Sequence, residues 1–264
     1  MEGVVFQGVI VKLKAVFLDL DGTVYRGAAE VPGAADFVRY CHQRGLRCLF
    51  ITNRANRTPL VVRDQLRGYG IPCETEDVLT SAQATARYLG GGTAWMIGEA
   101  GMEEALAEVG VRLTDQNPDA VVVSFDRQFS YDKMVTACKL IGKGARFVAT
   151  NPDHRLTFDG EIFPGTGSIV AAVATGSGVA PEVVGKPERR IFDMALDMIG
   201  CRPEEVLSIG DNIDTDIGAS VASGIKSVLL LTGISSRADV TADKPQPDYI
   251  LEDFAAVTAL VETL

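Results

Sequence analysis

Residues 15–23 read Ala-Val-Phe-Leu-Asp-Leu-Asp-Gly-Thr, an unbroken apolar run that passes directly into two aspartates and a glycine turn. Apolar runs without alternation are typical of strands covered on both faces, as in parallel sheets. Three further runs of this kind lie at residues 47–51, 206–209 and 226–231. Helical apolar spacing between the strands, as at Ile191, Met194 and Met198, predicts an α/β fold with a doubly wound, mainly parallel core sheet.

Polar motifs follow the ends of these strands. They are Asp19-Leu20-Asp21-Gly22-Thr23, Thr52-Asn53, Gly185-Lys186-Pro187 and Gly210-Asp211-Asn212 with Asp216 shortly after. In open α/β sheets, ligands bind beyond the carboxyl ends of the strands, so we expect these motifs to converge on one site. Carboxylates, a hydroxyl and an ammonium group are the parts needed to hold a divalent cation and to attack phosphorus with a carboxylate.

Length and composition narrow the class of protein. The 264 residues are 47% hydrophobic and carry a net charge of −10, which argues against nucleic acid or an anionic membrane surface as partner. No apolar stretch reaches the roughly 18 residues of a membrane span. The start, Met1 to Lys14, has no signal-peptide layout and is interpreted either as a short leading segment or as the result of an upstream start codon. Five scattered cysteines favour reduced thiols and a cytoplasmic location, and homo-oligomerisation is left open.

The middle of the chain forms a second pattern of alternating strands and helices. Expected elements are strands at 93–98, 120–124 and 146–149 and helices at 102–109 and 131–141. Glycine-rich stretches at 90–92 and 175–178 are predicted to be flexible breaks on either side. We therefore predict an inserted α/β domain at 82–179, between core segments 1–81 and 180–264.

Taken together, the four motifs resemble those of the haloacid dehalogenase superfamily. Further stretches are similar to its NagD-like branch of phosphatases, which have an inserted cap domain. They are Asp77-Val78-Leu79-Thr80-Ser81, Ala149-Thr150-Asn151-Pro152-Asp153 and Pro164-Gly165-Thr166-Gly167-Ser168. The resemblance covers nearly the whole chain after Lys14. It implies Mg²⁺-dependent hydrolysis of a small phosphorylated metabolite, of sugar phosphate, nucleotide monophosphate, phosphoglycolate, glycerol phosphate or pyridoxal phosphate type.

By this resemblance Asp19 is the nucleophile that forms an aspartyl-phosphate, and Asp21 is the general acid and then base. A lone aspartate after a strand is more often a turn cap, but Asp21, Lys186 and Asp211 together favour catalysis. The aspartate two residues after the nucleophile is also what separates phosphatases from the dehalogenases of the superfamily.

The remaining motif residues are expected to bind phosphate and metal. Thr52, Lys186 and the main-chain amides after Thr52, including that of Asn53, would bind phosphoryl oxygens. Mg²⁺ would be held by Asp19, the Asp21 carbonyl and Asp211, with Asp216 and Asn212 arranged around these ligands. Asp214 is predicted to cap the following helix. Arg54 and Arg57 could reach phosphate, but two arginines in a polar loop more often face solvent.

Substrate choice and two alternative functions complete the expectations. His154 and Arg155 lie in a loop of the insert that in NagD-like proteins faces the active site, so they are predicted to contact the leaving group. A solvated loop position is equally compatible with them. The alternatives are a sugar-phosphate mutase of the same superfamily, which needs a bisphosphate activator, and a phospho-receiver signalling module, which is shorter and lacks the second aspartate.

Overall fold

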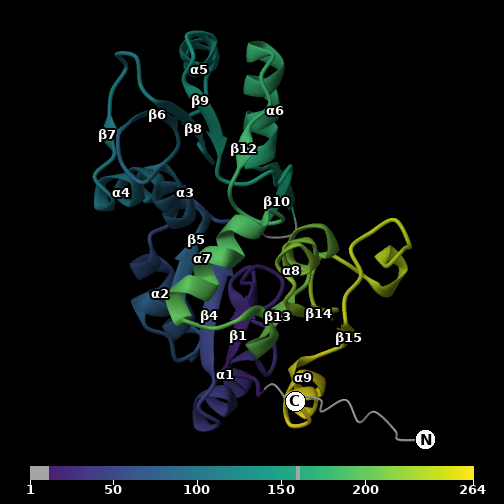
Figure 1. The fold of residues 1–264 in the computed structure, drawn as a ribbon. Coiled ribbons are helices and arrows are strands. Elements are labelled where there is room, and N and C mark those ends of the chain that lie inside the picture. The colour runs from purple at the N-terminus through teal and green to yellow at the C-terminus, as the bar shows by residue number, and fades with distance from the viewer. Residues whose placement is uncertain (1–11, 159–160) are drawn as a thin grey trace, which may run out of the picture.

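The computed structural model describes residues 12–158 and 161–264, so residues 1–11 of the predicted leading segment lie outside it. Its centre is a six-stranded parallel sheet in the order β15-β14-β13-β1-β4-β5 (Figure 1). The strands are β1 (Ala15–Leu18), β4 (Arg47–Thr52), β5 (Val78–Thr80), β13 (Val206–Gly210), β14 (Lys226–Leu230) and β15 (Tyr249–Leu251). The α/β class and the doubly wound parallel core are confirmed.

The unbroken apolar strands are explained by helices on both faces of this sheet. In β1, Val16 and Leu18 belong to one buried cluster, whereas Ala15 and Phe17 belong to the cluster on the opposite face. The first face is covered by α1 (Ala34–Gln43), α2 (Pro59–Gly68) and α9 (Phe254–Val261). The second is covered by α3 (Ser81–Leu89), α7 (Arg189–Ile199) and α8 (Gly218–Ser223). Every residue of β1 is therefore buried.

A second parallel sheet is built from the middle of the chain, in the order β12-β9-β8-β6-β7. Its strands are β6 (Thr93–Ile97), β7 (Arg112–Leu113), β8 (Ala120–Val123), β9 (Arg146–Ala149) and β12 (Glu182–Val183). One face carries α5 (Tyr131–Gly142) and α6 (Thr166–Ser177), and the other carries α3 and α4 (Ala100–Glu108). Since β12 comes after residue 179, the sheet ends slightly beyond the predicted return to the core. The domain limits themselves stay a prediction.

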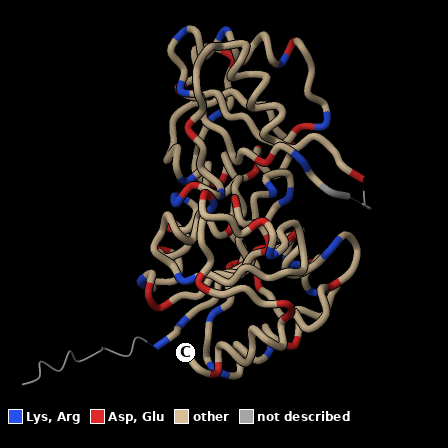
Figure 2. The backbone as a smooth tube through the Cα atoms, turned by 90° about the vertical axis from the view of Figure 1, so that its right-hand side faces the viewer, with Lys and Arg blue, Asp and Glu red and all other residues tan. Residues whose placement is uncertain are grey.

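The second sheet lies above the core sheet in Figure 1, with its carboxyl edge toward the core. Main-chain atoms of the core loop at Asn56 and Arg57 lie so close to Gly101 that a Cβ there would be 2.7 Å away. Ala55 of the same loop is buried with Met102 and other apolar residues of the insert. Charged residues of both signs are scattered along both parts (Figure 2). The insert is thus packed on the core through side chains as well as joined to it by two connections.

Several elements differ from the sequence-based expectations. The stretch 175–178 is not a flexible break, because Thr175, Gly176 and Ser177 are the last residues of α6. Gly176 marks a close approach instead, since a Cβ there would lie 2.9 Å from the Cys138 sulfur of α5. The hairpin of β10 (Arg155–Phe158) and β11 (Glu161–Pro164), like α6, β7 and β12, was not predicted. A small hairpin of β2 (Tyr25–Arg26) and β3 (Ala29–Glu30) follows β1.

Among the described residues, every helix is too short or too polar to cross a bilayer.

Candidate active site

The site lies where the core sheet changes its direction of winding. Strands β1 and β13 are neighbours, and the chain continues from β1 toward β4 and β5 but from β13 toward β14 and β15. Ligands in open α/β sheets bind at such switch points, outside the carboxyl ends of the strands. Asp19 directly follows β1 and Asp211 directly follows β13, so the topology brings two motifs that are far apart in sequence to one place.

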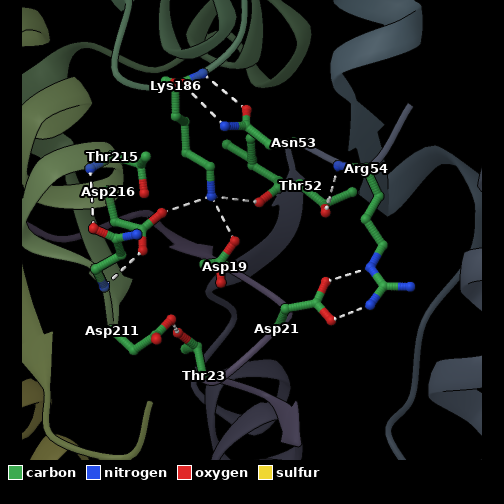
Figure 3. A network of polar contacts seen from close by, with 12 residues as sticks. Asp19, Asp21, Thr23, Thr52, Asn53, Arg54, Lys186, Asp211, Thr215 and Asp216 are labelled. Atoms are coloured by element: carbon green, nitrogen blue, oxygen red, sulfur yellow. Dashed lines mark hydrogen bonds and ion pairs between the residues drawn. The ribbon is translucent and has the colours of Figure 1, made fainter. Parts of the chain in front are cut away.

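Lys186 is the centre of the polar network in Figure 3. Its ammonium group donates to Asp19 Oδ1 at 2.5 Å, to Asp216 Oδ1 at 2.6 Å and to the Ile51 carbonyl at 3.1 Å. The side chain is only 2% exposed. Burial opposes its charge, but the two carboxylates outweigh burial and raise the pKa of Lys186 above its usual value. Lys186 is therefore a fixed cation against Asp19.

The carboxylate of Asp211 is held by two hydrogen bonds, one to each oxygen. Thr23 donates to Oδ1 at 3.0 Å, and the Ile234 amide donates to Oδ2 at 2.7 Å. Two glycines leave room for this carboxylate, since a Cβ at Gly22 or Gly233 would lie 2.4 or 1.8 Å from Oδ2. Gly22 also has φ +92°, a conformation that favours glycine. The role of the loop at Gly233 was missed from the sequence, although a Thr-Gly turn after a buried strand could have indicated it.

Three carboxylates gather with one ammonium group, which leaves negative charge unbalanced. Asp19, Asp211 and Asp216 offer oxygen atoms that all lie within 4.8 Å of one another. Burial, followed by repulsion from Asp216, raises the pKa of Asp211 to about 7 and that of Asp19 well above its usual value. Hard oxygen donors with surplus negative charge fit a hard divalent cation such as Mg²⁺.

Asp216 and Asn212 support the cluster rather than complete it. Both oxygens of Asp216 are already used, Oδ1 by Lys186 and Oδ2 by the main-chain amide of Asn212 at 3.1 Å. The side chain of Asn212 accepts from the Asp214 and Thr215 amides and so caps the π-helical turn Ile213–Ile217. The prediction that Asp214 is the cap is wrong, because Asp214 instead pairs with Lys244 at 2.6 Å.

Asp21 has a partner that the sequence did not reveal. Arg54 donates from Nε and Nη2 to the two oxygens of Asp21, at 2.7 and 2.6 Å. The expectation that Arg54 faces solvent is therefore wrong, whereas Arg57 turns away and donates to Gln65 of α2. With 40% of its side chain exposed, Asp21 remains open to a bound molecule. The fork of Arg54 fixes the plane of this carboxylate.

Thr52 is the last residue of β4, and Asn53 follows it beside Lys186. Thr52 is buried, and its hydroxyl oxygen accepts from the Arg54 amide at 3.1 Å, which leaves the hydroxyl hydrogen for another acceptor. Ser81 and Asn151 both donate to the Asn53 carbonyl, at 2.7 and 2.8 Å. The loop after β4 is thus tied both to the first residue of α3, where the insert begins, and to the turn after β9 inside the insert.

His154 and Arg155 lie apart from this network. Both are exposed, on the turn that leads from β9 into β10, and within the described residues their side chains take no part in the contacts around Lys186. The neighbouring Asp153, which was not singled out from the sequence, does reach the network through Asn53. Elsewhere on the insert, Glu99 accepts from Asn56 of the loop after β4 at 3.4 Å and pairs with Arg127 at 2.8 Å.

In sequence and in structure, the chain is similar to hydrolases of one family. The haloacid dehalogenase-like hydrolase family matches residues 16–112, and a second family of such hydrolases matches residues 183–257. The 5'-nucleotidase YutF of Bacillus subtilis is 36% identical over 90% of this chain and 95% of its own. An acid sugar phosphatase of Staphylococcus aureus is 36% identical over 94% of this chain and 98% of its own. The structure of NagD from E. coli matches with a TM-score of 0.87 and 33% identity over 92% of this chain and 98% of its own.

Proposed function

Because this chain belongs to the haloacid dehalogenase-like hydrolases and is a phosphatase of their NagD-like branch, we propose that it hydrolyses a small phosphomonoester with Mg²⁺, through an aspartyl-phosphate on Asp19. Sugar phosphates and nucleotide monophosphates are the first substrates to test, because relatives are named for them. Phosphoglycolate, glycerol phosphate and pyridoxal phosphate follow. The observation that carries the proposal is the buried ammonium group of Lys186, 2.5 Å from Asp19.

In the first step, an oxygen of Asp19 attacks phosphorus, and the bond from phosphorus to the leaving oxygen breaks. Asp21 gives a proton to that oxygen as its negative charge develops. Lys186 and the Thr52 hydroxyl face the phosphoryl oxygens, where fixed positive charge and a hydrogen-bond donor stabilise the transition state. Lys186 is bound to Asp19 before substrate arrives, so little reorganisation is needed.

In the second step, a water molecule attacks phosphorus of the aspartyl-phosphate and passes a proton to Asp21. The bond between phosphorus and Asp19 then breaks, which releases inorganic phosphate and restores both carboxyl groups. Arg54 donates to both oxygens of Asp21 and so holds the plane of this carboxyl group through both steps.

A bound Mg²⁺ would add positive charge against the phosphoryl oxygens. Asp19, the main-chain carbonyl of Asp21 and Asp211 are the residues that would hold it. Asp216 and Asn212 would keep these ligands in place, because Asp216 links Lys186 to the Asn212 amide.

The test is a panel of phosphorylated metabolites with the purified chain and Mg²⁺, read as release of inorganic phosphate. Multiple-turnover release from at least one phosphomonoester is the expected result. Release that appears only in trace amounts, together with isomerised product and a need for a bisphosphate activator, would replace the phosphatase with a mutase. Labelling of the chain by phosphate without turnover would favour a receiver module.

A further inference from the structure

The side-chain amide of Asn53 joins the core to the insert at the base of Lys186 (Figure 3). Its Oδ1 accepts from the main-chain amide of Lys186 at 2.9 Å, and its Nδ2 donates to the Lys186 carbonyl, also at 2.9 Å. This two-point contact fixes the backbone from which the catalytic ammonium group extends. Gly185 allows the main chain before Lys186 to approach Asn53, because a Cβ at Gly185 would lie 2.6 Å from Asn53 Oδ1.

The second hydrogen of the same Nδ2 points to the insert. Asn53 donates to the two carboxylate oxygens of Asp153, at 3.1 and 3.3 Å. Asp153 is itself held in a tight turn, since its amide donates to Asn151 Oδ1 at 3.1 Å and its carbonyl accepts from the Gly167 amide at 2.8 Å. The carboxylate is therefore presented to Asn53 by a turn after β9 that is hydrogen-bonded to the first residues of α6.

An ionised carboxylate can only accept hydrogen bonds, whereas an amide side chain has a donor end and an acceptor end. Asp153 thus favours the same orientation of the Asn53 amide as the Lys186 peptide does, with Nδ2 toward the insert and Oδ1 against the Lys186 amide. Burial raises the pKa of Asp153 to about 6, and above that pH its carboxyl is in the accepting form.

We infer that Asp153 of the insert is a positioning residue for Lys186 and acts through the side chain of Asn53. This inference rests on the proposed function. It assigns two roles to one turn: Asp153 faces inward and supports the chemistry of every substrate, while the exposed His154 and Arg155 are left to select among substrates. Since misalignment of a catalytic group by about 1 Å can cost on the order of 10²-fold in rate, the contribution is measurable.

The experiment compares Asp153→Ala with Asp153→Asn at a pH well above 6, with p-nitrophenyl phosphate and a sugar phosphate as substrates. Asp153→Ala should lower kcat for both by about 10- to 100-fold, with the ratio of their kcat/KM values unchanged within about twofold. Asp153→Asn should stay within about threefold of the native enzyme, because its amide oxygen can still accept from Asn53. Asp119→Ser is the control and should keep the native kcat. Like the test variants it removes hydrogen bonds accepted by an aspartate of the insert, here two from Thr93, but at the amino end of β8.

Native kcat in Asp153→Ala, equal impairment of Asp153→Asn, or a loss confined to one substrate would each overturn the inference. If Asp153→Ala shows no cooperative thermal transition, Asp153→Ser takes its place, because serine favours turns but is too short to reach Asn53.

A crystal structure of the variant gives a readout that is independent of activity. The separation of Asn53 Oδ1 and the Lys186 amide, 2.9 Å in the native chain, should exceed hydrogen-bond length. An unchanged contact would also refute the inference. Failure of the native chain to release phosphate would instead count against the proposed function, and the structural result would still decide the role of Asp153.

Discussion

The carboxyl edge of the core sheet and the β10–β11 hairpin of the insert are built in opposite ways. At the core edge, Lys186 and Asp211 are only 2% and 1% exposed, and each is bound by groups from distant segments. On the hairpin, Ile162 is 67% and Phe163 44% exposed. Removing the partner of a buried polar group costs free energy, because the group is left without a hydrogen bond. An exposed polar group forms a hydrogen bond with water instead. We therefore expect substitutions at the core edge to affect all substrates, and substitutions beside the hairpin to affect them selectively.

The sharpest test of the core edge is its nucleophile. Asp19→Asn keeps the shape of the side chain but removes the anion that attacks phosphorus, so turnover of p-nitrophenyl phosphate should fall by at least about 10³-fold. Circular dichroism should show a native fold. The exposed Asp119→Asn is the matched control and should keep full activity. Turnover of Asp19→Asn within tenfold of the native chain would show that the attacking group lies elsewhere.

Removal of the metal should lower activity almost as much as Asp19→Asn, because the carboxylates around Lys186 would be left with unbalanced negative charge. Chelation with EDTA is expected to abolish activity, and Mg²⁺ to restore it, with Mn²⁺ equal or weaker. Ca²⁺ should inhibit, since its larger and looser coordination misplaces Asp19 relative to phosphorus. Full activity in chelator, or a strict requirement for zinc, is incompatible with this site.

Replacing the central cation should have the next largest effect. Lys186→Ala removes the charge that faces both Asp19 and the phosphoryl group, and kcat should fall by about 10²–10³-fold, as when one transition-state donor is lost. The decrease should be the same for two phosphates of different size. Lys244→Ala, which breaks an exposed pair with Asp214, is the control. A change in the ratio of the two substrates would mean that Lys186 also reads the leaving group.

The sequence predicts the core edge better than it predicts the hairpin. Strands β1, β4, β13 and β14 were identified because burial on both faces leaves an unbroken apolar run. The motifs at their ends followed from the topology of parallel sheets. The hairpin of β10 and β11 carries no such signal, since all residues of β11 are exposed and nothing in their pattern reports a buried face.

The sequence predicted that the motifs converge, but not the individual side-chain partners of Arg54 and Asn53. Arg54 was expected to face solvent because the sequence of its polar loop does not show whether a carboxylate lies beside the arginine in the folded chain. Its pairing with Asp21 joins residues 33 positions apart, and that of Asn53 with Asp153 joins residues 100 apart. The first contact depends on how the loops after β1 and β4 fold over the core sheet, and the second on how the insert packs on the core. Both are properties of the tertiary structure and not of either local pattern.

The smallest expected effect lies beside the hairpin, at His154 and Arg155. Both are exposed at the turn that enters β10, so His154→Ala and Arg155→Ala should leave the aspartyl-phosphate chemistry intact. If they contact the leaving group, each should shift the relative kcat/KM of two natural phosphates of different size by about 1–3 kcal/mol, the scale of a lost polar contact. Arg112→Ala, an exposed arginine on β7, is the control and should leave this ratio unchanged. Equal losses for both phosphates, or none, would show that these side chains do not read the substrate. Selection would then fall to other residues of the insert, or to the shape of the insert alone.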